Sequence, residues 1–579
     1  MELEKIKILN FRNFEELDVN LKNRNVILGL NDAGKSNFLY AIRYLLDGKI
    51  RKSGFLESDY YNKNIKQEIE ITIWINIGEE TDVDNKKLYS IIQGATDTDI
   101  LCIKLVAAYD NDLMLGNAIL KWGSDESELE NMPSYGIKFA IDEIFNVVYI
   151  DSSVQLDKVF KRYTKNLLQE KNISEKERNT LDKKINGLNK SISMLENIKH
   201  IERDMGNVYK TYRNEKNIKI NIKSEIELEN IYSKLIPYIS YNKNEYFPTS
   251  GDGRMKILEY TLLTMESSEV SEKKINIFLI EELENHLHRS MQIALSYQLF
   301  EDNLFKHMFI TTHSDLIISQ MDKVNLIKLL DKDVANGNAL YYEVPDEYKM
   351  LKKKLNENLS KAIFYNTVLL VEGHSEKVLF EHIMMNVLPK YESEGGYILV
   401  VDGINFKEYY RILTQLGITV IVKTDNDFEI KKIKKIKGKK QQYKCIYIGI
   451  NRGLRLINMS EVNGKIITDI DKDDYEKNKI SKQENFYDNQ KPNMDILEKN
   501  KVFLSKVDLE NDLYDVIPDV FNNTFNGKTK DVNVKKMQKA KLINMINFCK
   551  NINKTTCIKI IQSERFKCIK ELIENVEHK

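Results

Sequence analysis

A glycine-rich segment near the N-terminus has residue types suited to holding phosphate groups. It reads GLNDAGKS over residues 29–36 and matches the pattern GxxxxGK[ST]. An apolar run, Val26–Leu28, precedes it and a helical run, Asn37–Ile42, follows it. Backbone N–H groups of such a loop close around phosphate oxygens, the lysine reaches the β- and γ-phosphates, and the hydroxyl ligates Mg²⁺. The residues predicted to bind nucleotide here are Gly29, Asn31, Gly34, Lys35 and Ser36.

Two shorter motifs follow apolar strands later in the chain. Ile277–Ile280 ends in Glu281 and Glu282, where one carboxylate can hold the Mg²⁺ shell and the next can orient an attacking water. Met308–Ile310 runs into His313, which could sense a γ-phosphate. A lone histidine is more often structural, but its place after the other two motifs favours a functional role.

Three further apolar strands also end in acidic residues. The strands cover residues 367–371, 419–422 and 502–504, and the acids that follow them are Glu372, Glu376, Asp425, Asp427, Asp508 and Glu510. Open α/β sheets place their chemistry at the carboxyl ends of strands, and hard oxygen ligands select Mg²⁺ or Mn²⁺ over zinc. With 87 acidic residues in the chain, any one of these is more often a solvated carboxylate. Their order is more specific, and it indicates metal-dependent phosphodiester chemistry.

The elements that must position these residues alternate between strands and helices. Glu68–Ile77 alternates apolar and polar residues, which predicts a strand with one buried face, and Val147–Ile150 predicts a short buried strand. A charged helix, Glu347–Ala362, is a plausible connector between two α/β regions. Residues 465–500 are polar with few apolar anchors and are interpreted as a mobile insertion.

A lysine-, glutamate- and asparagine-rich stretch from about Leu156 to Ile239 has apolar residues at helical spacing. The stripe consists of Leu181, Ile185, Leu188, Ile192, Leu195 and Ile198. Two interpretations stay open: a pair of surface helices packed on their own domain, or a dimerisation arm inserted into it.

Composition excludes several classes of protein. Lysine and arginine balance aspartate and glutamate at 87 each, which excludes a histone-like basic chain. The five cysteines form no CxxC pair, so a zinc ribbon or disulfide scaffold is not expected and a reducing cytoplasm fits. No run of 18 apolar residues occurs, so no membrane span is expected.

The nucleotide motifs together resemble the ABC-type ATPases of the SMC and RecF group. In that group Glu282 matches the catalytic glutamate and His313 the switch histidine, while Glu281 replaces the usual aspartate. Ser250 and Gly251 resemble a degenerate signature motif that contacts nucleotide bound by a second subunit, which implies a dimer. The plainer interpretation of these two residues is a turn before a helix.

The acidic motifs resemble a Toprim domain. An ABC-type ATPase followed by a Toprim domain is the architecture of the overcoming-lysogenization-defect (OLD) nucleases, and the match is closer still to nuclease subunits of the Gabija anti-phage system. Its most telling stretches include VEGHSEK at 371–377, KTDND at 423–427 and DLENDLY at 508–514. One departure is Leu283, where the family has proline, which predicts a looser turn and puts ATP turnover in doubt.

The resemblance implies two divalent ions in the Toprim site. Glu372, Asp425 and Asp427 match ligands of one ion, and Glu376, Asp508 and Glu510 match ligands of the other. Lys541 matches a basic residue that stabilises the transition state. A lysine-rich segment, Lys431–Lys444, follows the Asp425–Asp427 loop and either contacts DNA phosphates or is a solvated loop.

The predicted fold is therefore α/β, with an ABC/SMC-like ATPase domain at 1–345, a helical dimerisation insertion at 155–240, and a Toprim nuclease domain with its connector helix at 346–579. The resemblance implies a nucleotide-regulated endonuclease that nicks double-stranded DNA, a homo-oligomer (dimer or tetramer), a UvrD-like helicase partner and a cytoplasmic location. A RecF-like repair clamp without cleavage is the alternative, although it has no use for the second acidic set.

Overall fold

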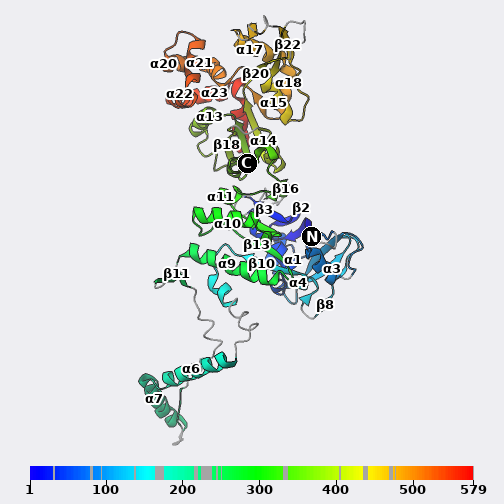
Figure 1. Cartoon of the computed structure of the whole chain (residues 1–579), viewed down its shortest axis with the longest axis vertical. Coiled ribbons are helices and arrows are strands. Elements are labelled where there is room, and N and C mark those ends of the chain that lie inside the picture. Colours follow the sequence, from blue (N-terminus) through cyan, green and yellow to red (C-terminus); the bar gives the residue numbers. More distant parts are fainter. Residues whose placement is uncertain are drawn as a thin grey trace.

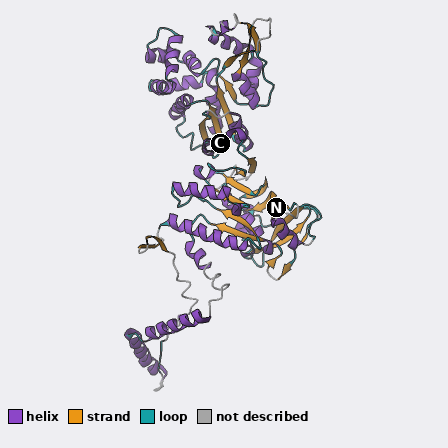
Figure 2. Ribbon diagram, viewed as in Figure 1, coloured by secondary structure: helices purple, strands orange, loops and turns teal. Residues whose placement is uncertain are grey.

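The computed structural model describes the chain except residues 30–32, 79–82, 93, 136–137, 163–174, 214–218, 223–237, 243–244, 249–250, 330–336, 403–405, 434–440, 469–471, 473, 476 and 578–579. Figure 1 shows two stacked α/β bodies, with a helical arm extending from the N-terminal one. Figure 2 shows that both bodies combine sheets with covering helices. No helix among the described residues is long and apolar enough to cross a membrane.

The N-terminal body contains an antiparallel sheet of order β2-β1-β4-β5-β6-β7. Its strands are β1 (Glu2–Phe11), β2 (Phe14–Asn20), β4 (Ile69–Asn76), β5 (Ile100–Asp110), β6 (Leu115–Gly123) and β7 (Glu130–Asn131). The alternation predicted near β4 is confirmed: Ile69, Ile71, Ile73 and Ile75 are all fully buried. Short helices α2 (Gly48–Arg51), α3 (Val83–Ile92) and α4 (Ile141–Ile144) and the hairpin β8 (Ser134–Tyr135)–β9 (Lys138–Phe139) lie in the same region.

A second, mostly parallel sheet carries the nucleotide motifs, in the order β10-β13-β14-β3-β15-β16. The strands are β3 (Arg24–Leu28), β10 (Phe145–Ile150), β13 (Ile275–Ile280), β14 (Met308–Thr311), β15 (Val324–Leu329) and the antiparallel β16 (Gly337–Tyr342). Helix α1 (Lys35–Leu46) contacts both sheets and shares one buried cluster with Ile277 and Leu279. Phe278 and Ile280 pack in the other cluster, with α9 (Asp252–Val270) and α10 (Arg289–Glu301). This alternation buries β13 on both faces.

The stretch interpreted as surface helices or a dimerisation arm contains α6 (Glu175–Ser193) and α7 (Glu196–Arg213). Figure 1 shows both helices away from the two α/β bodies. Apolar side chains on these helices and in the turn between them are exposed, with relative exposures between 37% and 55%: Leu181, Leu188, Met194, Leu195, Ile201 and Met205. A hairpin of β11 (Tyr238–Asn242) and β12 (Glu245–Pro248) leads back to the body.

The connector is shorter as an α-helix than the sequence indicates. A 3₁₀ segment, Asp346–Leu351, comes first, and α12 follows at Lys352–Ala362. Asn356 on α12 donates to the carbonyl oxygens of Ser319 (3.0 Å) and Met321 (2.9 Å) beside α11 (Asp315–Ile318). One continuous buried cluster runs from β3 through α12 into the second body. The two bodies are therefore packed together through this helix.

The second body is built on a parallel sheet of order β18-β17-β19-β23. Its strands are β17 (Thr367–Val371), β18 (Gly396–Val400), β19 (Thr419–Thr424) and β23 (Val502–Leu504). Helices α13 (His374–Val387), α14 (Phe406–Gln415) and α15 (Ile448–Leu456) and the small sheet β20 (Phe428–Lys432), β21 (Gln442–Tyr447) and β22 (Lys465–Thr468) complete it. Six helices end the chain: α19 (Leu509–Val516), α20 (Pro518–Phe525), α21 (Lys530–Lys539), α22 (Lys541–Cys549), α23 (Lys554–Ile561) and α24 (Lys567–Glu577).

The interpretation of residues 465–500 as a mobile insertion is wrong for the part that the structure describes. After β22, this stretch forms α17 (Lys479–Asn489) and α18 (Lys491–Lys499). Its few apolar residues are well used: Phe486 stacks on Tyr447 with ring centroids 3.8 Å apart, and Met494 and Leu497 are buried. The polar composition did not predict these helices, because a few apolar side chains on one helix face are enough to pack a helix against its neighbours.

Candidate nucleotide and metal sites

The glycine-rich loop has the geometry that its sequence predicts. It leads from β3 into α1, and Gly34 has a φ of 94°, a conformation that favours glycine. A side chain on Gly34 would collide with the amide of Asn13. Gly29 directly follows β3, whereas Asn31 lies outside the described residues.

The lysine and serine of the loop point toward the nucleotide motifs. Lys35 is buried and donates to the carbonyl oxygen of Gly29 at 3.0 Å. Ser36 Oγ donates to Glu281 Oε1, and Tyr149 Oη donates to Glu281 Oε2 at 2.5 Å. Burial and then Glu281 raise the pKa of Tyr149 well above its usual range, so the phenol stays a donor. Ser36 and Glu281 thus meet where a nucleotide-bound Mg²⁺ would be held.

The end of β13 is joined to the end of β14 through Glu284. Its carboxylate accepts from Thr312 Oγ1 (2.7 Å) and from the backbone N–H of His313 (2.5 Å). Glu282 has a φ of 42° and accepts from Asn285 Nδ2 at 2.7 Å. The turn that Leu283 was expected to loosen is held by these bonds and by the full burial of Leu283.

His313 lies near the glycine-rich loop. Partial burial, and then the positive charge of Lys35, lowers the pKa of His313. A neutral imidazole beside the phosphate site can accept or donate a hydrogen bond without adding a second fixed charge. Gly251 precedes α9 and is exposed, with no atom within 4 Å of where a side chain would start, while Ser250 lies outside the described residues.

The carboxyl ends of β17, β19 and β23 lie side by side and bring the second acidic set together. Glu372 Oε1 accepts from Thr424 Oγ1 (2.6 Å) and from the backbone N–H of Asp425 (3.3 Å). Arg452 on α15 also donates to Glu372 Oε1. Glu376, in the first turn of α13, accepts from the Gly373 N–H at 3.1 Å.

Burial and mutual repulsion raise the pKa of two carboxylates at this site. Burial raises the pKa of Asp425 well above its usual value, and Glu372, Glu376, Asp508 and Glu510 raise it further. Burial, and then Glu372, raises the pKa of Asp427. These six acids therefore repel one another, which disfavours their charged forms unless cations are present.

The third strand contributes a lysine as well as acids. Asp508 begins α19, accepting from the Asn511 N–H (2.8 Å), and its other oxygen accepts from Gln538 Nε2 (3.0 Å). Glu510 is 1% exposed, with Oε1 3.3 Å from Lys541 Nζ. Its Oε2 is buried with no hydrogen-bond partner. A buried carboxylate oxygen without a donor fits a metal ligand.

No three acidic, histidine or cysteine side chains already form a coordination shell in the part of the chain that the structure describes. Protein donors explain this, because Arg452, Lys541, Gln538 and Ser505 (Oγ to Asp425 Oδ1, 3.1 Å) bind the carboxylates. The donor set still fits hard divalent cations, since it is all oxygen and includes the unpaired Glu510 oxygen.

Four contributors were missed by sequence analysis: Tyr149, Arg452, Ser505 and Gln538. Ser505 had a signal, because it follows β23 directly, as the acids follow β17 and β19. Arg452 lies 80 residues from Glu372 and has no motif of its own. Tyr149 and Gln538 likewise carry no local pattern that separates them from other tyrosines and glutamines.

A buried ion pair joins the metal-site strand β19 to helix α19. Lys423 on β19 and Asp512 on α19 are 2% and 1% exposed, with Nζ and Oδ2 3.5 Å apart. We expect Lys423→Met to lower the free energy of unfolding by about 3–5 kcal/mol, because it leaves Asp512 charged and buried. Urea unfolding measures this.

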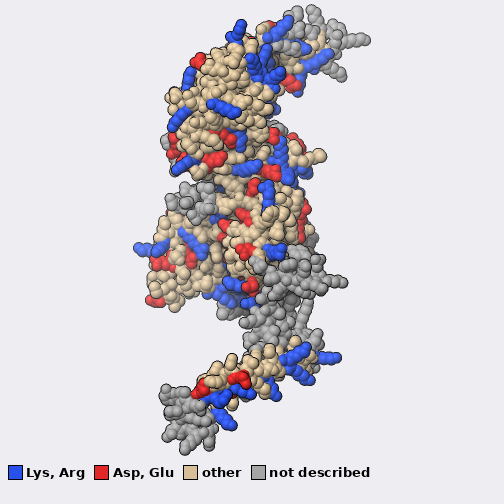
Figure 3. Space-filling view, turned by 90° about the vertical axis from the view of Figure 1, so that its left-hand side faces the viewer, with Lys and Arg blue, Asp and Glu red and all other residues tan. Residues whose placement is uncertain are grey.

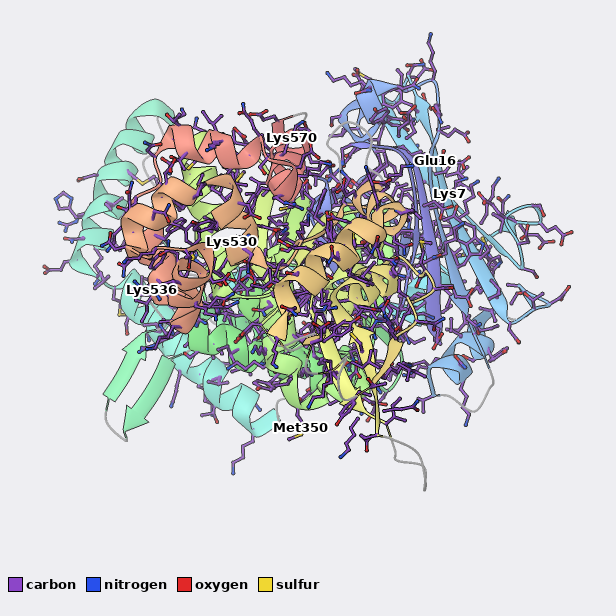
Figure 4. All side chains as sticks on the ribbon, turned by 90° about the horizontal axis from the view of Figure 1, so that it is seen from above. Lys7, Glu16, Met350, Lys530, Lys536 and Lys570 are labelled. Carbon is purple, nitrogen blue, oxygen red and sulfur yellow. The ribbon has the colours of Figure 1, made fainter. Side chains whose placement is uncertain are left out.

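The matched control for that prediction is Lys570→Met. Lys570, labelled in Figure 4, pairs with Glu574 on the surface of α24 and should contribute less than about 1 kcal/mol. Adding Asp512→Leu to Lys423→Met should restore most of the loss. Equal unfolding midpoints for Lys423→Met and Lys570→Met would contradict a structural role for the buried pair.

Comparison with known proteins identifies the two domains that carry these residues. Residues 1–318 match the AAA ATPase domain family, and residues 363–427 match the Toprim domain of overcoming-lysogenization-defect-like proteins. The chain is 39% identical to endonuclease GajA of Bacillus cereus (strain VD045) over 99% of both chains. It is 22% identical to the Old nuclease of Escherichia phage P2, over 74% of this chain and 78% of that one. These matches confirm the predicted combination of an ATPase domain with a Toprim domain, which implies ATP and a divalent metal as cofactors. The chain belongs to the GajA family of ATPase–Toprim endonucleases.

Proposed function

We propose that this protein nicks double-stranded DNA at the Toprim site, under the control of nucleotide bound at the ATPase site, as part of anti-phage defence. One observation carries the proposal: three adjacent strand ends bring six carboxylates and Lys541 together. A repair clamp has no need of this second site. The 39% identity to an endonuclease over nearly the whole chain supports the same function.

Each side chain of the Toprim site has a proposed role. Glu372, Asp425 and Asp427 hold one Mg²⁺ or Mn²⁺, and Glu376, Asp508 and Glu510 hold the other. Two such ions activate water and neutralise the leaving oxygen of an in-line displacement. Lys541, already beside Glu510, places its charge where the phosphate oxygens become more negative. Arg452 orients Glu372, and Gln538 orients Asp508.

At the other site, Gly29, Asn31, Gly34 and Lys35 hold the phosphates of ATP. Ser36 and Glu281 hold its Mg²⁺, Glu282 orients water and His313 contacts the γ-phosphate. Ser250 and Gly251 of a second subunit complete the site, and the exposed Gly251 is compatible with this role. The exposed apolar side chains of α6 and α7 support pairing of subunits through this arm, as a dimer or tetramer.

Basic side chains near the Toprim site are the proposed DNA contacts. Lys431, Lys432 and Lys444 lie on β20 and β21, while residues 434–440 of that segment lie outside the described residues. Exposed lysines also lie on α21 and at the start of α22: Lys535, Lys536 and Lys539, of which Figure 4 labels Lys536, and Lys541. Figure 3 shows Lys and Arg side chains gathered at the Toprim end of the molecule. Such contacts hold phosphates without reading bases.

The proposed assembly has a UvrD-like helicase subunit, GajB-like, as partner, and the proposed location is the cytoplasm. The proposed domain limits are 1–345 for the ATPase domain, 155–240 for its dimerisation insertion and 346–579 for the connector and Toprim domain.

Incubation with supercoiled plasmid tests the proposed activity. We expect nicked circles with Mg²⁺ or Mn²⁺ and none with EDTA, because the carboxylates need cations to act on a phosphodiester. Increasing ATP at constant free Mg²⁺ should slow nicking. Relaxed closed circles would instead indicate a topoisomerase, and unchanged plasmid with both metals would favour the clamp.

A further inference from the structure

The ATPase and Toprim bodies meet at an aromatic contact beside the nucleotide site. The His313 ring, just after β14, lies against the Phe364 ring with centroids 5.8 Å apart and an angle of 31° between the planes. Phe364 belongs to the four-residue segment Ile363–Asn366, which joins α12 to β17. The histidine that is predicted to sense the γ-phosphate thus contacts the segment that leads into the metal-site strand.

The same segment is held from a second element of the nucleotide site. Lys328 on β15 is 2% exposed, and its Nζ donates to the carbonyl oxygens of Ile363 (3.0 Å) and Tyr365 (2.5 Å). These two carbonyls flank Phe364. The next residue, Leu329, packs against the start of the glycine-rich loop, since a side chain on Gly29 would lie 3.0 Å from its carbonyl oxygen. His313 after β14 and Lys328 on β15 therefore both contact the segment that contains Phe364.

On the Toprim side, the segment contacts the two strands that carry the acids. β17 begins at Thr367, and the carbonyl oxygen of Asn366 accepts from the N–H of Thr419, the first residue of β19, at 2.9 Å. β17 ends before Glu372 and β19 before Asp425. A strand of five residues spans about 17 Å, so these two strands link the segment directly to the acids.

The Phe364 ring borders an open space, while the two carbonyl groups that flank it are bound by Lys328. A cavity of about 950 Å³ lies at this junction, lined in part by His313, Phe364, Tyr365 and Tyr397. Tyr365 stacks on Tyr397 with centroids 4.6 Å apart, which leaves Phe364 as the ring that faces the ATPase body. The ring therefore has a neighbouring space that it can enter when His313 takes another partner.

We infer that Phe364 is the positioning residue that couples nucleotide binding to the metal site. This rests on the proposed function. The γ-phosphate and the Phe364 ring are alternative partners of His313. When nucleotide takes His313, the Phe364 ring turns into the adjoining cavity and displaces the start of β17 and β19, and Glu372 and Asp425 leave the arrangement that cleaves DNA. The two states are in equilibrium, and nucleotide biases it.

Nicking and ATP inhibition of Phe364→Ala and Phe364→Tyr, at constant free Mg²⁺, test the inference. Phe364→Ala should nick as the wild type does without nucleotide and bind ATP at least as tightly, because His313 loses a competing contact. The factor by which ATP slows nicking should fall at least about fivefold, which is the lower end of the coupling measured between linked sites. Phe364→Tyr keeps the ring and should keep the inhibition. A purely structural residue would change nicking with and without ATP alike.

A measurement without catalysis accompanies the assay. Hydrogen exchange of the β17 amides should change when a non-hydrolysable ATP analogue binds the wild type, and should not change in Phe364→Ala. If ATP inhibits Phe364→Ala as strongly as it inhibits the wild type, the inference is overturned while the proposed function stays intact. Loss of nicking without ATP in both Phe364→Ala and Phe364→Leu would also overturn it. An uninhibited wild type would instead contradict the proposed regulation, and the inference with it.

Discussion

Replacing Glu376 by glutamine should abolish DNA nicking while leaving the fold and ATP binding intact. Glutamine keeps the size of the side chain and an oxygen that can accept from the Gly373 N–H, but it removes the charge. Changes in groups that merely orient a metal ligand lower activity by about 10- to 100-fold, so loss of a ligand itself should cost at least about 100-fold. Plasmid nicking measures the activity, and calorimetric titration with Mn²⁺ measures the metal affinity.

The matched control is Glu381→Gln on the same helix, α13. Glu381 pairs with Lys377, 3.4 Å away, on the partly exposed side of the helix. The Glu381→Gln protein should nick DNA as the wild type does. Full activity in a folded Glu376→Gln protein would remove Glu376 from the site and leave Asp508 and Glu510 to be tested in the same way.

Replacing Lys35 by alanine should weaken ATP binding by about 10- to 100-fold, because a hydrogen bond from a charged group to a phosphate contributes about 1.5–3 kcal/mol. The ATP concentration that inhibits nicking should rise by the same factor, since the Toprim acids are on another sheet. Equilibrium binding of a fluorescent ATP analogue and the plasmid assay measure the two effects.

Lys49→Ala serves as the control for Lys35→Ala, because Lys49 is an exposed lysine on the nearby helix α2. It should change neither measurement. If Lys35→Ala lowers nicking in the absence of ATP, the ATPase domain acts as a motor that cleavage requires, and inhibition is not its main role. An unchanged ATP affinity would contradict both roles.

Local motifs were predictable because the physics that creates them is local. The glycine-rich loop needs one strand, two glycines and one helix, all within about 20 residues, and the structure has them in that order. Apolar runs fully buried in a parallel sheet have sharp ends, so the predicted bounds of β17 and β23 match the structure at Thr367–Val371 and Val502–Leu504. Acids directly after such strands must lie at one edge of the sheet.

What the sequence alone determined is therefore the chemistry: a phosphate-binding loop, acids at strand ends, and their order along the chain. Only the tertiary structure decided which acids meet, because the strand order β18-β17-β19-β23 places Asp508 and Glu510 beside Asp425 across some 80 residues of chain. It alone also provided Arg452 beside Glu372, the packing of α17 and α18, and the contact of His313 with Phe364. Each of these depends on which surfaces pack against each other over long sequence separations, and such packing is set by the whole buried core rather than by any local pattern.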